Sequence, residues 1–240
     1  DARFVYVADD AGFPYGNQSE DALIARVRRV IGEAIARYKP DLVVIACNTA
    51  STIALSDLRA HFSVPFVGTV PAIKPACAQS ASKRIAVLGT LATVSREYTR
   101  ALIREFASGC HVALVGSPRL ATYAEAELAG TPATDVEIAG EILPCFLDEE
   151  GQRTDTIVLA CTHYPLLAER FRRVAPWPVE WIDPAPAIAR RVVQLIGAAP
   201  DGAAKGEALA LFTGERPMAP RLREALARAG FGEIAAFRLS

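Results

Sequence analysis

The chain contains one phrase twice. Residues 41–47 read Asp-Leu-Val-Val-Ile-Ala-Cys, and residues 155–161, 114 positions later, read Asp-Thr-Ile-Val-Leu-Ala-Cys. Each copy is a short β-branched apolar run that ends at a cysteine, which is typical of a buried parallel strand. Because open α/β sheets bind ligands at the carboxyl ends of their strands, the repeat predicts one cleft with a sulfur on each wall, Cys47 on one side and Cys161 on the other.

The rest of the chain alternates between strand and helix patterns, which predicts βαβ units with parallel sheets. Strands are expected at 4–8, 41–46, 65–70, 84–89, 112–115, 156–160, 179–182, 208–212 and 234–237. Helices are expected at 19–38, 51–61, 95–106, 121–129, 134–148, 187–196 and 220–229, and from Pro165 onward. Residues 197–205 are expected to form an irregular loop. The fold class is therefore α/β, with two pseudo-symmetric halves that face a cleft.

Composition excludes several function classes. The chain has 240 residues, of which 51% are hydrophobic, and its net charge is −1. This balance favours a packed globular protein and gives no electrostatic reason to expect nucleic acid or a membrane surface as partner. The five cysteines are odd in number and contain no CxxC, so a reducing compartment is expected rather than a disulfide framework. The three histidines and the cysteine spacing do not make a metal site, and no metal is expected.

Two facing thiols suit a specific chemistry. A thiolate is a nucleophile and a modest base, and a helix N-terminus or a nearby cation lowers its pKa. If one sulfur removes a proton from a carbon and the other returns one from the opposite face, the stereocentre inverts. Such a site must also stabilise an enolate-like charge, for which the candidate donors are Asn48, Thr49, Thr90, Thr93 and Thr162.

Other residues have plainer interpretations. Cys77, Cys110 and Cys145 are expected to be small core residues, and His61 and His111 are expected at the surface. Thr90 and Thr93 have the spacing of a helix cap, and Pro14-Tyr15-Gly16 is an ordinary turn signal. Glu125 lies on a helical stretch where solvent exposure is the default. His163, two positions after Cys161, is a candidate for lowering the pKa of that thiol.

The residues resemble those of the glutamate racemase family. Ala46-Cys47-Asn48-Thr49-Ala50-Ser51 and Cys161-Thr162-His163-Tyr164-Pro165-Leu166-Leu167 are similar to its two signature motifs. Asp9 with Pro14-Tyr15-Gly16 resembles its substrate loop, and Gly89-Thr90-x-x-Thr93-Val94 resembles its carboxylate-binding turn. The likeness runs in order from about Phe4 to Val193.

The resemblance implies a cofactor-independent racemase that interconverts L- and D-glutamate and supplies D-glutamate for peptidoglycan in a bacterial cytoplasm. Cys47 would take the proton from D-glutamate and Cys161 from L-glutamate, with His163 and Glu125 assisting. The implied substrate-binding residues are Pro14, Tyr15, Gly16, Asn48, Thr49, Thr90, Thr93 and Thr162. The implied domains are 1–79 plus 184–240, and 80–183, with a possible homodimer as the assembly.

One part of the family pattern is not found in the sequence. Family members carry an Asp-Ser-Gly motif on a first strand, and nothing before Phe4 matches it. The first half also supplies only one strand and one helix before the strand that leads to Cys47. We therefore expect the first strand-helix unit of that half to be missing from this sequence.

Three alternatives stay open. The first is a racemase of the aspartate or hydantoin type. The second is a one-cysteine hydrolase or decarboxylase. The third is a glutamate-binding or regulatory protein without catalytic activity.

Overall fold

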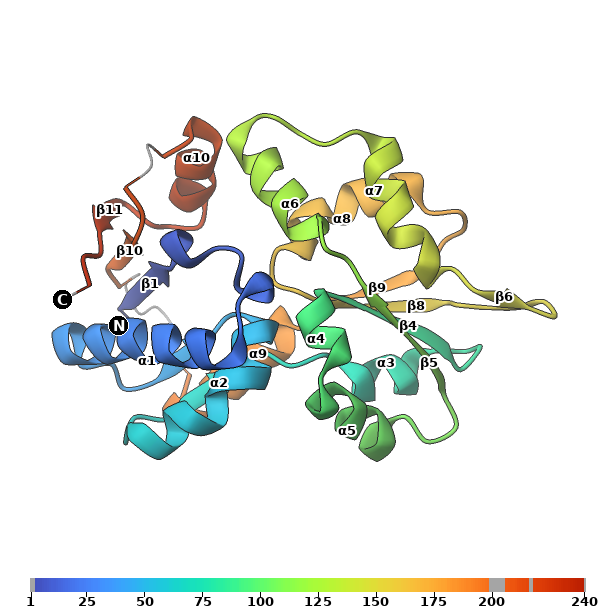
Figure 1. The fold of residues 1–240 in the computed structure, drawn as a ribbon, viewed down its shortest axis with the longest axis horizontal. Coiled ribbons are helices and arrows are strands. Elements are labelled where there is room, and N and C mark those ends of the chain that lie inside the picture. The colour runs from blue at the N-terminus through green and yellow to red at the C-terminus, as the bar shows by residue number, and fades with distance from the viewer. Residues whose placement is uncertain (1–2, 199–205, 216–217, 240) are drawn as a thin grey trace.

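The computed structural model describes residues 3–198, 206–215 and 218–239. Its elements form two groups, and both described chain ends lie in the same group (Figure 1). The predicted α/β class with mainly parallel sheets is confirmed. Among the described residues, the one antiparallel pair is the short hairpin of β6 (Asp148–Glu149) and β7 (Gln152–Arg153).

A four-stranded parallel sheet forms the centre of one group. Its order is β5 (His111–Gly116), β4 (Arg84–Gly89), β8 (Thr156–Ala160) and β9 (Glu180–Ile182). All five residues of β8 are buried, which explains why its sequence is a continuous apolar run rather than an alternating one.

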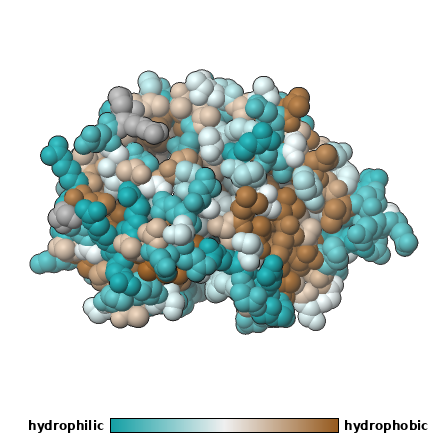
Figure 2. All heavy atoms as spheres, viewed as in Figure 1, coloured by the Kyte–Doolittle hydropathy of each residue, from teal (hydrophilic) through white to brown (hydrophobic). Residues whose placement is uncertain are grey.

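Helices cover both faces of this sheet (Figure 1). One face carries α3 (Ile73–Gln79) and α5 (Glu97–Phe106), and the other carries α6 (Leu120–Ala129), α7 (Asp135–Ile142) and α8 (Ala168–Val174). The 3-10 turns η3 (Leu143–Cys145) and η4 (Tyr164–Leu167) adjoin the second layer. Hydrophilic residues cover the tip made by the β6–β7 hairpin, and hydrophobic residues gather over the sheet (Figure 2).

The second group contains two smaller parallel sheets. One has the order β1 (Phe4–Ala8), β10 (Ala208–Phe212) and β11 (Glu233–Ala236), and the other pairs β2 (Val43–Ile45) with β3 (Phe66–Gly68). The remaining elements of this group are η1 (Asp10–Gly12), η2 (Tyr15–Asn17), α1 (Glu20–Tyr38), α2 (Asn48–His61), α9 (Ala185–Ile196) and α10 (Pro220–Arg228). The short helix α4 (Leu91–Ser95) instead packs mainly on β4 and β5 of the first group.

Helix α1 joins the two small sheets because it packs on both. Val30 contacts the cluster that contains Leu209 and Leu211, whereas Leu23 and Val27 belong to the cluster that contains Ile45. Helix α1 therefore covers strands from two distant parts of the chain, residues 4–68 and residues 208–237. The domain boundaries at 79/80 and 183/184 stay a prediction.

Most expected elements are present within one to three residues of their predicted bounds. The short helix α4 was not predicted, and two further regions differ. The helix expected over 134–148 ends at Ile142, because Pro144 cannot continue the helix, and the β6–β7 turn follows with positive φ at Glu150 and Gly151. Helix α3 was not predicted. Pro71 and Pro75 obscured its signal, although a proline in the first turn of a helix needs no N–H partner. Most of the expected 197–205 loop lies outside the described residues.

The residues singled out in the sequence follow the carboxyl ends of four strands. Asp9 follows β1, Cys47 follows β2, Thr90 follows β4 and Cys161 follows β8. This is the edge at which α/β sheets bind ligands. In the described part of the chain, no helix is long and apolar enough to cross a membrane.

Candidate functional site

Cys47 is the N-cap residue of α2. Its backbone is extended, and its Sγ accepts a hydrogen bond from the Ala50 amide at 3.4 Å. Burial raises the pKa of the Cys47 thiol, and the hydrogen bonds from Ala50 and Thr49 reduce that rise without cancelling it. Without a ligand the thiol is therefore held neutral at the end of β2, with the helix N-terminus ready to stabilise a thiolate.

Cys161 begins the turn after β8 and forms the first member of a chain of three residues. Its Sγ lies 3.9 Å from Nδ1 of His163, and Nε2 of His163 lies 2.8 Å from a carboxylate oxygen of Glu125 on α6. Burial raises the pKa of Cys161 to about 12, and the negative charge of Cys47 acts in the same direction. Glu125 is thus not a free surface residue but orients His163 toward the thiol.

The turns that carry the two cysteines are in contact. The Thr162 hydroxyl donates to the carbonyl of Ala46 at 3.0 Å, so the residue after Cys161 binds the residue before Cys47. The cleft with two sulfurs that the repeated phrase predicts is consistent with this arrangement.

Three threonine hydroxyls form a triangle next to Cys47. Thr49 Oγ1 lies 3.1 Å from that of Thr90 and 3.3 Å from that of Thr93, and Thr90 and Thr93 are 3.0 Å apart. Thr90 also caps α4 by accepting the Thr93 amide. Thr90 and Thr93 therefore form the helix cap that the sequence predicts and also belong to a hydroxyl cluster able to bind an anion.

The loop before α1 closes one side of the site. Pro14 precedes η2, and Gly16 lies next to Thr90, since an added Cβ would be in ordinary contact with the Thr90 side chain at 3.5 Å. Burial, the hydrogen bond to Asp9 and the nearby Cys47 raise the pKa of Tyr15. The rings of Phe13 and His163 are 5.4 Å apart, so this loop reaches both cysteine-bearing turns.

The Asn48 side chain is buried and unpaired next to Cys47. The residue is 2% exposed, and among the described residues neither its amide nitrogen nor its oxygen has a hydrogen-bond partner. Unpaired buried amides are rare because each costs free energy, so this one points to a ligand that supplies both a donor and an acceptor.

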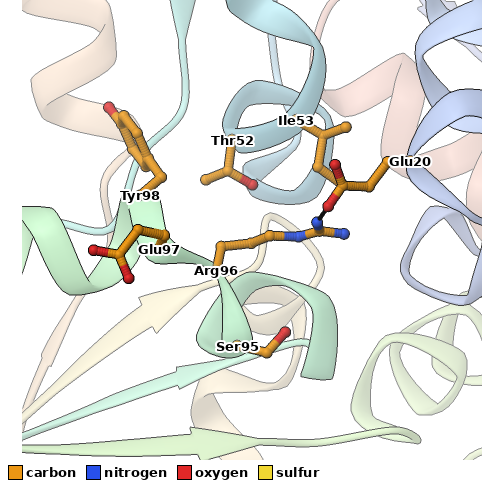
Figure 3. A pocket seen from close by; sticks show the side chains of 7 residues that line it. All are labelled: Glu20, Thr52, Ile53, Ser95, Arg96, Glu97 and Tyr98. Carbon is orange, nitrogen blue, oxygen red and sulfur yellow. Dashed lines mark ion pairs between the residues drawn. The ribbon is translucent and has the colours of Figure 1, made fainter.

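Cavity volume alone does not find this site. A cavity of about 320 Å³ lies beside it, lined by Glu20, Thr52, Ile53, Ser95, Arg96, Glu97 and Tyr98. There the Arg96 guanidinium reaches from the α4–α5 junction to an ion pair with Glu20 of α1 (Figure 3). A second cavity of about 30 Å³ is lined in part by Pro14, Gly16 and Thr90, and it has room for about one water molecule.

All twelve residues expected at the site fall into one connected region. Sequence reasoning missed the group that holds the loop of residues 9–17: Asp9 accepts hydrogen bonds from both Arg26 and Thr213 as well as from Tyr15. Asp9 was visible as part of a motif, but no sequence pattern links it to Thr213, which is 204 positions away.

Comparisons with known proteins identify the family. The model of the Asp/Glu/Hydantoin racemase family matches residues 2–192. A glutamate racemase of Brucella anthropi is 59% identical over 197 residues, covering 82% of this chain and 71% of the relative. A glutamate racemase of Brucella canis is 55% identical over 220 residues, covering 90% and 79%.

A solved structure gives the same result. Escherichia coli glutamate racemase, determined with L-glutamate and the activator UDP-MurNAc-Ala, aligns with a TM-score of 0.89 at 37% identity, over 100% of this chain and 90% of that one. The family match, the close relatives and this shared fold show that the chain belongs to the Asp/Glu/hydantoin racemase family.

Proposed function

We propose that this protein interconverts L- and D-glutamate by proton exchange at the α-carbon, with Cys47 and Cys161 as the two bases and no cofactor or metal. The observation that supports it most is the Thr162–Ala46 hydrogen bond, because it places the two cysteine-bearing turns side by side. The names of the relatives favour glutamate over aspartate or a hydantoin as substrate.

In the proposed reaction, the Cys47 thiolate removes the α-proton of D-glutamate while the Cys161 thiol donates its proton to the opposite face. The product is L-glutamate, and the two sulfurs have exchanged protonation states. In the reverse direction the Cys161 thiolate is the base and Cys47 is the acid. General acid–base assistance of this kind contributes roughly 10²–10⁴-fold per group.

The thiol that acts as the base must first lose its proton, because burial raises the pKa of both cysteines. For Cys161, His163 Nδ1 is placed to accept it, and Glu125 stabilises the imidazolium through Nε2. The substrate's own ammonium group would favour the thiolate further, since an opposite charge nearby lowers a thiol pKa. The rate should accordingly fall as the pH drops.

The remaining residues would hold the substrate. The threonine triangle of Thr49, Thr90 and Thr93 offers hydroxyl donors to a carboxylate, and the Asn48 amide offers both a donor and an acceptor. Donors aimed at a carboxylate that takes on enolate character stabilise the transition state more than the ground state. Pro14, Tyr15 and Gly16 would form the wall that covers the ligand.

The test is racemisation in heavy water. Wild-type protein should convert each glutamate enantiomer into the other with deuterium at the α-carbon, and Cys47→Ser and Cys161→Ser should each abolish the conversion. Near-normal racemisation by either variant would favour a one-cysteine enzyme and overturn the two-base assignment.

Two further measurements separate the alternatives. Faster turnover of aspartate or a hydantoin would reassign the substrate. Glutamate binding by calorimetry without deuterium exchange would identify a binding protein instead.

Rescue of a bacterial strain that requires D-glutamate would test the proposed supply of D-glutamate for peptidoglycan in the cytoplasm. Sedimentation would test the proposed homodimer.

A further inference from the structure

We propose that Asp9, Arg26 and Thr213 form a positioning cluster that fixes the Tyr15–Gly16 turn against the active-site threonines and thereby sets the affinity for the substrate. The kinetic part of this proposal rests on the proposed function. None of the three residues is expected to touch the substrate.

The Asp9 carboxylate is saturated with donors. Oδ2 accepts from the Tyr15 hydroxyl and from Nε of Arg26, and Oδ1 accepts from Nη2 of Arg26 and from the Thr213 hydroxyl, all four at 2.6 Å. A carboxylate has about four lone-pair positions, so all of them are occupied. The side chain is 6% exposed, and a buried charge with four donors is held in one geometry.

This saturation determines what Tyr15 can do. Its hydroxyl hydrogen is donated to Asp9 and is therefore not available to a substrate carboxylate. What Tyr15 brings to the site is the position of its backbone and of Gly16, which lies against Thr90. The Asp9 carboxylate therefore fixes the position of the Tyr15–Gly16 turn.

Thr213 ties this fixed point to the C-terminal part of the chain. It follows β10, its amide donates to the Ala8 carbonyl at 3.1 Å, and its hydroxyl accepts from the Ala11 amide at 3.2 Å while donating to Asp9. Next to it, the Gly214 amide donates to Asp10 at 2.7 Å. The segment after β10 thus supplies donors and an acceptor to three successive residues of the loop, 9 to 11.

The Asp9 carboxylate stays ionised near neutral pH. Burial works to raise the pKa of Asp9, but the hydrogen bonds from Arg26, Thr213 and Tyr15 together outweigh it and hold the pKa below its usual value. We therefore expect the cluster to be weakened by removal of a hydrogen-bond donor and not by protonation of Asp9 near neutral pH.

The decisive variants are Thr213→Val, which removes the hydroxyl at nearly constant volume, and Thr213→Ser, which keeps it. Thr134→Val is a matched control, because Thr134 makes the capping box of α7 far from this loop in the sequence. Each variant is measured for kcat and KM with both enantiomers, for thermal stability, and for amide hydrogen exchange across residues 11–17 without substrate.

We expect Thr213→Val to raise KM about fivefold to tenfold with kcat changed less than twofold, as for one lost charge-assisted hydrogen bond, and to speed exchange in residues 11–17. Thr213→Ser should stay near wild type. Thr134→Val should lower the melting temperature and leave KM and the loop exchange unchanged.

Unchanged amide hydrogen exchange across residues 11–17 in Thr213→Val would show that Thr213 does not hold the loop. Equal losses in kcat and kcat/KM with KM unchanged would overturn the positioning role. If wild-type protein does not racemise glutamate, the proposed function fails by itself, and hydrogen exchange still decides whether Thr213 holds the loop.

Discussion

The hydroxyl of Thr162 donates a 3.0 Å hydrogen bond to the backbone carbonyl of Ala46. These residues are 116 positions apart, and each adjoins one of the two cysteines of the repeated phrase. The bond therefore aligns the two thiol-bearing turns directly, without relying on the packing of more distant helices.

Removing this bond should damage catalysis more than folding. Thr162→Val should lower kcat/KM about tenfold or more, since small displacements of reacting groups are costly, while the free energy of unfolding drops by about 1 kcal/mol or less. Steady-state kinetics and urea unfolding measure the two effects. Thr162→Ser should restore the rate, and an equally slow serine variant would show that the hydroxyl bond is not the cause.

Glu125→Gln should slow the reaction in both directions by the same factor. Glutamine still accepts a hydrogen bond from His163 but no longer stabilises an imidazolium, so we expect a loss of about tenfold to a hundredfold in kcat/KM. The equilibrium constant between enantiomers is one, which requires equal values of kcat/KM in the two directions. Polarimetry from each enantiomer measures both, and a rate within twofold of wild type would rule out a role for the carboxylate.

Asn48→Ala should separate stability from function. The buried amide has no hydrogen-bond partner among the described residues, so its removal should leave the melting temperature unchanged or raise it. Glutamate affinity should fall about tenfold or more because a polar contact to the ligand is lost. Calorimetry and thermal unfolding give the two numbers, and a large loss of stability with unchanged affinity would mean that Asn48 is structural.

Gly12 and Gly140 form a matched pair for alanine substitution. A Cβ at Gly12 would lie 2.3 Å from Nε of Arg26 and 2.5 Å from Oδ2 of Asp9, so Gly12→Ala should destabilise the protein by about 1–3 kcal/mol. Gly140 lies within α7 with open space around it, and Gly140→Ala should stabilise by about 0.5–1 kcal/mol. Urea unfolding tests both signs, and a neutral Gly12→Ala would show that the Asp9–Arg26 pair yields easily.

Alkaline pH should destabilise the protein through its buried thiols. Burial raises the pKa of Cys145 to about 12, whereas the thiol of an unfolded chain has a pKa of about 8.5. The folded state keeps its proton in this window and the unfolded state loses it. The stabilisation is therefore complete below about pH 8.5 and is lost as the pH rises toward the folded-state value, at about 1.4 kcal/mol per pH unit.

Cys145→Ala provides the measurement, because it removes this one titration. Unfolding free energies at pH 7.5 and 10 should show a shallower decline in the variant than in wild type, whatever cavity cost the substitution adds at both values. Identical slopes would mean that the Cys145 thiol ionises equally easily in both states.

The sequence predicted the features that depend on local pattern and repetition. The two strand-cysteine phrases and the strands at Phe4–Ala8 and Ala208–Phe212 could be read from β-branched runs and their turn residues. The pairing of β1 with β10 could not, because these parallel partners lie about two hundred residues apart and neither contains a register signal.

The residues of the candidate site likewise fall into those that the sequence predicts and those that it does not. Cys47, Cys161 and His163 follow recognisable strands, so their type and position suffice to select them. Glu125 was noted only through a resemblance, since a glutamate on a helix is normally exposed, and its contact with His163 depends on how α6 packs over the sheet. Thr213 had no signal at all, because its importance comes from the tertiary meeting of two distant strand ends.

The threonine triangle has a consequence for how such a site responds to an anion. Three hydroxyls in mutual contact each carry one hydrogen, and each can turn that hydrogen by rotation about a single C–O bond. A carboxylate arriving beside Thr49, Thr90 and Thr93 could thus be solvated by reorienting hydrogens alone, with every oxygen staying where it is. The recognition step at this wall would then leave almost no trace in heavy-atom positions, and neutron diffraction would be the method that reveals it.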